Sequence, residues 1–141
     1  MIPVTQTILL GDPSGERGNC FAACIASILE LPIEQVPNFC NHDDWRLRTN
    51  EWLSLRGLAY LDVNLVGDAR DELVRFWGYH VISGDGPRGV RHAVVGLRGE
   101  IVWDPHPTRA GLLDGPEAWD YGLFVRTFEA GAHEMGSQGP S

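Results

Sequence analysis

The feature that most constrains this chain is an apolar run that directly follows a glycine-rich loop. Residues 20–31, CFAACIASILEL, are apolar on nearly every side and stop at Pro32. A run of this length, rich in Ala and Leu, is too long for most strands and predicts a buried helix. The preceding GDPSGERG is dense in turn formers and predicts a loop, so Asn19 or Ser14 is the nearest polar cap.

The rest of the chain divides into a helical part and a part rich in strand patterns. Further helices are predicted over residues 43–56 and 68–77, with one short turn between Pro32 and Pro37. Strands are predicted over residues 60–66, 79–82, 91–97, 100–104 and 123–128, and residues 4–10 predict a first strand or an extended arm. A buried helix ahead of an antiparallel sheet is an α+β layout.

Length and composition predict one soluble domain. The 141 residues match the commonest domain size, and we expect a single domain over residues 1–128 with a flexible tail over residues 129–141. No apolar run approaches the ~20 residues that a membrane-spanning helix requires. Residues 1–6 show neither a basic nor an apolar signal segment, so no membrane partner is expected.

The net charge and the number of cysteines indicate which classes of partner and which cellular compartment to expect. With 11 basic against 19 acidic residues, the net charge of −8 disfavours nucleic acid, because a phosphate backbone attracts the opposite field. Three cysteines are an odd number, which favours free thiols in a reducing cytoplasm. No cofactor is expected.

Three residues in separate segments form a candidate catalytic set. Cys20 stands where the loop enters the buried helix, and helix N-termini favour the thiolate that attacks carbonyls. His92 begins the strand HAVVG, and Asp104 ends the strand IVWDP. Counting outward from a two-residue turn at Arg98-Gly99 places His92 and Asp104 opposite each other to within one residue. An acid beside a histidine fixes the imidazole tautomer.

Each of these residues also has a plainer interpretation. A helical cysteine is usually a packing residue, a histidine at a strand start is often only a polar end, and Asp-Pro opens many turns. A zinc site is a further alternative, since Cys20, Cys24, Cys40 and His42 have an allowed spacing. An apolar helix is a poor setting for such a site, so no metal is expected.

The stretches GNCFAACIASILELP, HAVVG and WDPHP together resemble papain-like cysteine peptidases of the bacteriocin-processing type and their short relatives in bacterial and phage genomes. The resemblance covers about residues 4–30 and 90–107. It implies a papain-like α+β fold, with an N-terminal nucleophile helix packed on an antiparallel β-sheet. It also implies that Cys20 is the nucleophile, His92 the base, Asp104 its orienter and Gln6 an oxyanion donor.

The chain departs from the family pattern near the thiol. Phe21 stands where the family commonly has glycine, and it is expected to close the pocket or to alter what approaches Cys20. The spacing from Gln6 to Cys20 is longer than usual, which makes Asn19 an alternative oxyanion donor. We expect Trp103 to cover the site, His106 to be an exposed loop residue and His80 to point out of the sheet.

These observations favour a thiol-dependent acyl-transfer enzyme, with a cysteine peptidase or isopeptidase as the first candidate and a peptide or protein as substrate. A catalytically silent papain-like scaffold that binds or sequesters a partner is the alternative. Transglutaminase-like or amidase activity is a third, because such enzymes use a similar order of Cys, His and Asp.

Overall fold

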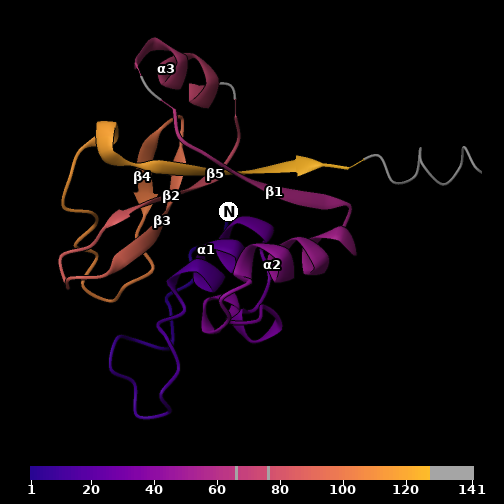
Figure 1. Cartoon of the computed structure of the whole chain (residues 1–141), viewed down its shortest axis with the longest axis vertical. Helices are drawn as coiled ribbons and strands as arrows, with labels where there is room; N and C mark the ends of the chain where they lie inside the picture. The colour runs from indigo at the N-terminus through magenta and orange to yellow at the C-terminus, as the bar shows by residue number, and fades with distance from the viewer. Residues whose placement is uncertain (66, 76, 128–141) are drawn as a thin grey trace, which may run out of the picture.

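The computed structural model describes residues 1–65, 67–75 and 77–127, and in it two helices pack on an antiparallel sheet (Figure 1). Helix α1 spans Cys20–Leu29 and helix α2 spans Trp45–Ser54. Helix α1 packs against strands β2 and β3, whereas α2 packs against β1. The expected α+β class is confirmed, and the tail over residues 129–141 lies outside the described residues.

The sheet has five strands in the order β1-β5-β2-β3-β4, and all neighbours are antiparallel. The strands are β1 (Leu58–Val63), β2 (His80–Asp85), β3 (Arg91–Leu97), β4 (Glu100–Trp103) and β5 (Asp120–Arg126). Helix α3 (Gly67–Arg75) follows β1, and three short 3-10 helices occupy connections: η1 (Ile33–Gln35), η2 (Phe39–Asn41) and η3 (Pro116–Ala118). The strand predicted to start at residue 123 begins three residues earlier, at Asp120.

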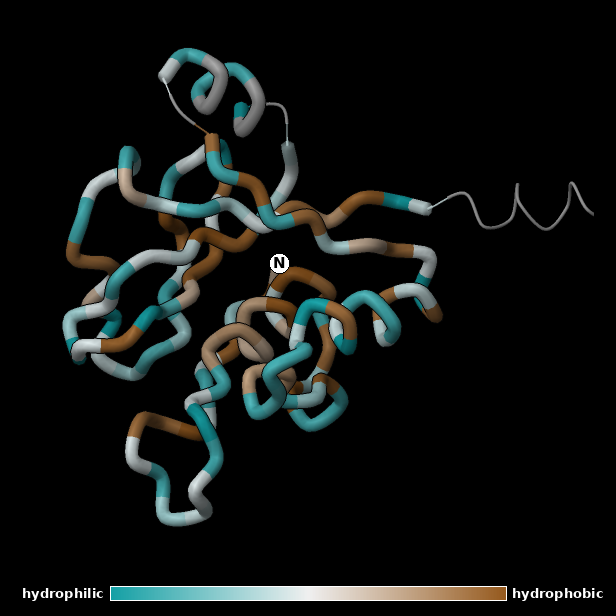
Figure 2. The backbone as a smooth tube through the Cα atoms, viewed as in Figure 1, coloured by the Kyte–Doolittle hydropathy of each residue, from teal (hydrophilic) through white to brown (hydrophobic). Residues whose placement is uncertain are grey.

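Helix α1 forms the centre of the main core, as its sequence predicts. Residues from Phe21 to Ser27 are all buried, and Ile25 is fully enclosed, whereas Ile28 and Leu29 are half-buried. Figure 2 shows hydrophobic stretches along this helix and along the strands near it. The helix ends where Glu30 adopts a left-handed conformation ahead of Pro32, which cannot continue a helix.

A second apolar cluster involves strands β2, β3 and β5. It is formed by Ile82, Val94, Trp119 and Tyr121. His80 in β2 is also completely buried, so the expectation that it points out of the sheet is wrong. Its ring lies 5.9 Å from that of Tyr121. Strand propensity and alternation do not report which strands will be covered on both faces.

Residues 4–10 were predicted to form either a first strand or an extended arm. They form the arm, and no strand is assigned to them. The backbone N–H of Gln6 donates to the carbonyl of Pro105 at 2.9 Å, and Trp103 Nε1 donates to the carbonyl of Val4 at 2.9 Å. The arm therefore joins the start of the chain to the segment that follows β4. The loop after the arm projects away from the sheet (Figure 1).

Among the described residues, no helix combines the length and the apolar character that crossing a bilayer would require.

Candidate active site

Cys20 is the first residue of α1, as predicted. The first hydrogen bond of the helix runs from the Ala23 N–H to the Asn19 carbonyl at 3.0 Å, so the amides of Cys20 and Phe21 precede the internal ladder. Cys20 is partly exposed, whereas Cys24, one turn later, is completely buried. Burial raises the pKa of Cys24 well above its usual value and raises that of Cys40 to about 11.

Asn19 does not cap the helix with its side chain. Its Oδ1 instead accepts the backbone N–H groups of Thr7 and Ile8 at 3.0 and 2.8 Å, and its Nδ2 donates to Thr7 Oγ1 at 3.0 Å. With 5% exposure, Asn19 holds the N-terminal arm against the start of α1. Its Oδ1 and one hydrogen of its Nδ2 are therefore bound to the arm, and Asn19 lines neither cavity beside Cys20, which favours Gln6 over Asn19 as an oxyanion donor.

His92 and Asp104 are in direct contact, as expected. His92 Nε2 lies 2.7 Å from Asp104 Oδ1, and both side chains are buried. The β3–β4 hairpin turns at Arg98 and Gly99, both with positive φ, which matches a tight two-residue turn. A bulge opposite Val95 shifts the register, so Asp104 reaches His92 from beyond the end of β4 rather than as its ladder partner.

The carboxylate of Asp104 is held by three donors. Oδ1 also accepts the His106 N–H at 2.9 Å, and Oδ2 accepts the Gly111 N–H at 2.6 Å. Burial alone would raise the pKa of Asp104, but these bonds, led by the one from His92, hold it below its usual value. The group is therefore an ionised acceptor that fixes the His92 ring.

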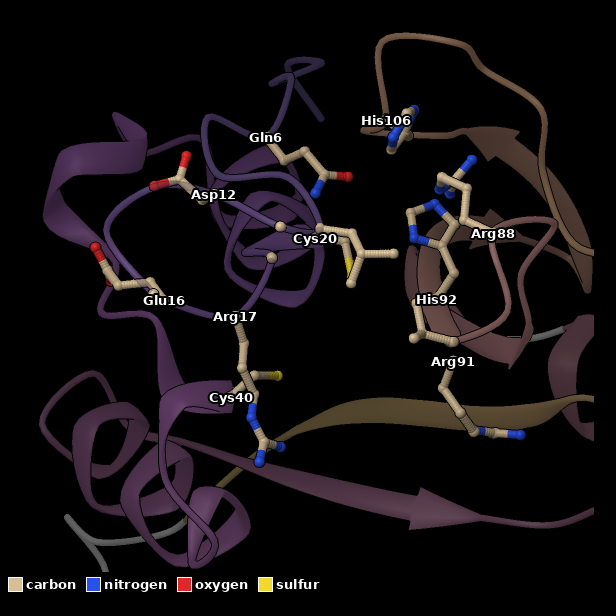
Figure 3. A pocket seen from close by; sticks show the side chains of 15 residues that line it. Gln6, Asp12, Glu16, Arg17, Cys20, Cys40, Arg88, Arg91, His92 and His106 are labelled. Atoms are coloured by element: carbon tan, nitrogen blue, oxygen red, sulfur yellow. The ribbon is translucent and has the colours of Figure 1, made fainter.

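The environment of His92 favours its protonated form. Burial alone would lower the pKa of His92, but the hydrogen bonds with Asp104 and then with the Cys20 thiol outweigh it and raise the pKa to about 9. Because Nε2 is occupied by Asp104, the ring presents Nδ1 to Cys20. Figure 3 shows the His92 ring and Cys20 facing each other across the cavity.

His106 is part of the site, contrary to the expectation of an exposed loop residue. It is 8% exposed, and its ring lies edge-on to that of His92 with centroids 6.1 Å apart. Its Nδ1 accepts the Thr108 N–H at 3.1 Å, which leaves the ring proton on Nε2. Burial and then the charge of Arg88 lower the pKa of His106. The sequence signal is Asp104 itself, since Asx turns direct the N–H two residues ahead onto the carboxylate.

Arg109 locks the segment after β4, and sequence reasoning missed it. Its guanidinium donates to the carbonyl of His106 at 2.8 Å and to Thr5 Oγ1 at 2.9 Å, and it lies 4.2 Å from the centre of the Trp103 ring. Trp103 does not line the cavities beside Cys20. It therefore anchors the arm to the sheet instead of covering the site as expected.

Gln6 lies beside the Cys20 thiol, as the resemblance implies, but one hydrogen of its side-chain amide is already in a hydrogen bond. It is 6% exposed, and its Nε2 donates to the carbonyl of Ile8 at 2.9 Å. Its Oε1 is buried without a hydrogen-bond partner within the described structure. Only the second hydrogen of Nε2 remains for a substrate oxygen.

Two cavities meet at the Cys20–His92 pair. The larger, of about 550 Å³, extends over the glycine-rich loop to Arg88 and His106. The smaller, of about 390 Å³, is lined by an aromatic group of Phe21, Trp45 and Tyr60. Phe21 is packed into this group and does not close the approach to the thiol. An extended substrate would therefore have room on both sides of Cys20.

Metal binding has little support in the described part of the chain, where no three or more His, Cys, Asp or Glu side chains gather as a metal site would need. Cys24 is enclosed in the core and His42 is exposed, so the proposed zinc set is not brought together.

Comparison with known proteins gives no independent assignment: no protein-family model matches the chain, and no curated protein or solved structure matches it significantly.

Proposed function

We propose that this protein is a thiol-dependent acyl-transfer enzyme of papain-like architecture that hydrolyses a peptide or isopeptide bond. The observation that carries the proposal is that Cys20 faces the ring of His92, whose Nε2 is bound to the ionised carboxylate of Asp104. A nucleophile next to a base that is itself oriented by an acid is what covalent acyl transfer requires. Their position between two cavities leaves space for the acyl and leaving groups.

In the first step, Cys20 attacks the substrate carbonyl as the thiolate, paired with protonated His92; a C–S bond forms and the carbonyl π electrons move onto the oxygen. His92 is protonated at neutral pH because its pKa is about 9, so its Nδ1 can deliver a proton to the departing amine. The C–N bond then breaks and leaves a thioester on Cys20. Asp104 keeps the imidazole oriented and stabilises its charge throughout.

In the second step, the now neutral His92 takes a proton from water, which attacks the thioester and releases the acid. The developing oxyanion in both steps would be bound by the backbone N–H of Cys20 at the helix end. The second hydrogen of Gln6 Nε2 is the other available donor, since its first is bound to Ile8.

The same residues would serve an amidase or a transglutaminase-like enzyme, which differ in the acceptor that resolves the thioester. A peptide or protein substrate suits the two-sided cleft. A reducing cytoplasm suits a site that needs a free thiol, and all three cysteines are unpaired. The alternative from another class is a silent scaffold that binds a partner in the same cleft.

Acylation by p-nitrophenyl acetate tests the proposal against the scaffold alternative. Wild-type protein should release one equivalent of nitrophenolate in a burst, carry an acetyl group on Cys20 by mass spectrometry, and then turn over. Cys20→Ser and His92→Ala should lose the burst, whereas the matched control Cys40→Ser should keep it. A wild-type protein that acetylates Cys20 no faster than Cys40 would reject the enzyme in favour of the scaffold.

A further inference from the structure

Arg88 places a positive charge beside the Cys–His pair. It lies on the turn between β2 and β3, where the Gly86 N–H donates to the Val90 carbonyl at 2.9 Å. Its side chain is half-buried and lines the larger cavity together with Cys20 and His92. Figure 3 shows Arg88 next to His92, on the side of the cavity where His106 lies.

The guanidinium of Arg88 has no carboxylate partner among the described residues. Its one side-chain hydrogen bond, from Nη1 to Thr108 Oγ1, measures 3.5 Å, which is long for an N–H···O bond. Arg91, the first residue of β3, differs because it forms ion pairs with Asp120 at 2.8 Å and with Asp85 at 3.7 Å. Three arginines therefore line the same cavity: Arg91 is neutralised, Arg17 points towards Cys40, and Arg88 lies beside His92 without a carboxylate partner among the described residues.

The carboxylates that line this cavity are engaged elsewhere. Asp12 accepts the hydroxyl and the N–H of Ser14 at 2.6 and 3.0 Å, and Glu16 accepts Asn41 Nδ2 at 2.9 Å. Figure 3 shows Asp12 and Glu16 on the far side of Cys20 from Arg88. Although the chain carries a net charge of −8, the part of the cavity next to His92 is therefore cationic.

We propose that this site accepts acyl substrates that carry a carboxylate near the reacting carbonyl, and that Arg88 binds that carboxylate. The proposal rests on the proposed function and specifies its substrate class. A planar guanidinium donates two parallel N–H bonds to a carboxylate, which provides orientation as well as attraction. The carboxylate would be an acidic side chain or a C-terminal carboxyl group.

Alkylation with iodoacetate and iodoacetamide tests this, because the two reagents differ only in carboxylate against amide. In both, the Cys20 sulfur displaces iodide, which leaves with the bonding electron pair as the S–C bond forms. The measured quantity is the ratio of the two second-order rate constants at neutral pH and low ionic strength. Since His92 also attracts the anion in every variant that retains it, the comparison is made between variants.

The Arg88→Gln substitution should lower the iodoacetate-to-iodoacetamide ratio about fivefold, the range expected for a partly exposed charged hydrogen bond. Arg88→Lys should keep part of the preference. Arg17→Gln is the matched control, because Arg17 lines the same cavity but points towards Cys40 in Figure 3, and the ratio should change less than about twofold. Thermal unfolding of each variant reports whether it is folded.

Two failures can be told apart. If the ratio is the same in wild type and Arg88→Gln while Cys20 still reacts far faster than Cys40, the carboxylate proposal is overturned and the proposed function stands. Equal losses in Arg88→Gln and Arg17→Gln would also overturn it, since they indicate a diffuse field rather than a site. Slow reaction of Cys20 with both reagents, at the rate of an ordinary thiol, would instead remove the proposed function and this inference with it.

Discussion

The two ends of the β2–β3 ladder each bury a histidine, and they hold it in opposite ways. At one end His92, opposite Gly84, is bonded to the ionised Asp104, and its pKa is raised to about 9. At the other end His80, opposite Gly96, has only the Gly78 carbonyl at 2.9 Å from its Nδ1, and burial lowers its pKa. Its Nε2 has no partner within the described structure. Burial alone therefore lowers the pKa of a histidine in this sheet, whereas a fixed carboxylate raises it.

The largest effect should come from removing the acid at the His92 end. Asp104→Asn leaves the shape of the side chain but removes the charge that orients His92 and raises its pKa, so the acylation rate of Cys20 should fall about 100-fold or more. The burst of nitrophenolate measures it. His80→Leu is the comparison variant, and its burst rate should stay close to that of wild type. Similar losses in both variants would mean that the two ends are not chemically distinct.

A smaller effect, on the free energy of unfolding, is expected when a methyl group is added at Gly96, opposite His80. The Cβ of Gly96→Ala would lie 2.5 Å from Ile82 Cδ1 and 2.7 Å from His80 Nε2 in the closed core. Such overpacking costs typically about 1–3 kcal/mol, which urea unfolding would detect. Per folded molecule, the reactivity of Cys20 should be retained. An unchanged unfolding free energy would show that this end is loosely packed.

Acidic pH should lower the unfolding free energy through the His80 end of the ladder. The pKa of His80 is lowered below 6.5 in the folded protein, so the unfolded chain binds more protons and the unfolding free energy should fall as the pH drops through 6.5. His80→Leu, which cannot be protonated, should flatten this dependence. Denaturant midpoints across mildly acidic pH measure it, and an equally steep fall in the variant would assign the acid sensitivity to other groups.

Alkaline pH should lower the unfolding free energy through His92, which is the opposite pH dependence to that of His80. The pKa of His92 rises from 6.5 to about 9 on folding, so its contribution to stability is complete below 6.5 and is lost as the pH rises through about 9. In Asp104→Asn the decline should occur at lower pH and be smaller. Coincident curves for wild type and variant would indicate that the His92–Asp104 contact contributes no pH-dependent stability.

The sequence predicted the parts of this site that depend on local patterns. The start of α1 at Cys20 follows from a loop that gives way to an apolar run. The two-residue turn of the hairpin was also predicted and brings His92 and Asp104 to the same end of the sheet, but the bulge that sets their actual register was not. The strand boundaries were predicted to within about three residues, with β5 starting earlier than expected at Asp120.

The parts that escaped prediction depend on contacts between distant segments. Asn19 was expected to serve the helix or the oxyanion, but the arm that it binds can be seen only in the fold. His80 and His106 were expected to be exposed because each lies in a polar or alternating segment, and only the packing of other strands and loops encloses them. The contact between Arg109 and Thr5 joins residues 104 positions apart, which no local pattern reports.

Because the N-terminal arm binds a segment near residue 104, the parts of the site come together in a fixed order during synthesis. The bond between Trp103 and Val4 joins residues 99 apart, and Cys20 leaves the ribosome long before His92. At about 5–20 residues per second, roughly 4–15 seconds of synthesis separate the nucleophile from its base. During that interval Cys20 lacks the imidazole of His92. The arrangement of Cys20, His92 and Asp104 is therefore complete only after the segment that follows β4 has been synthesised and has bound the N-terminal arm.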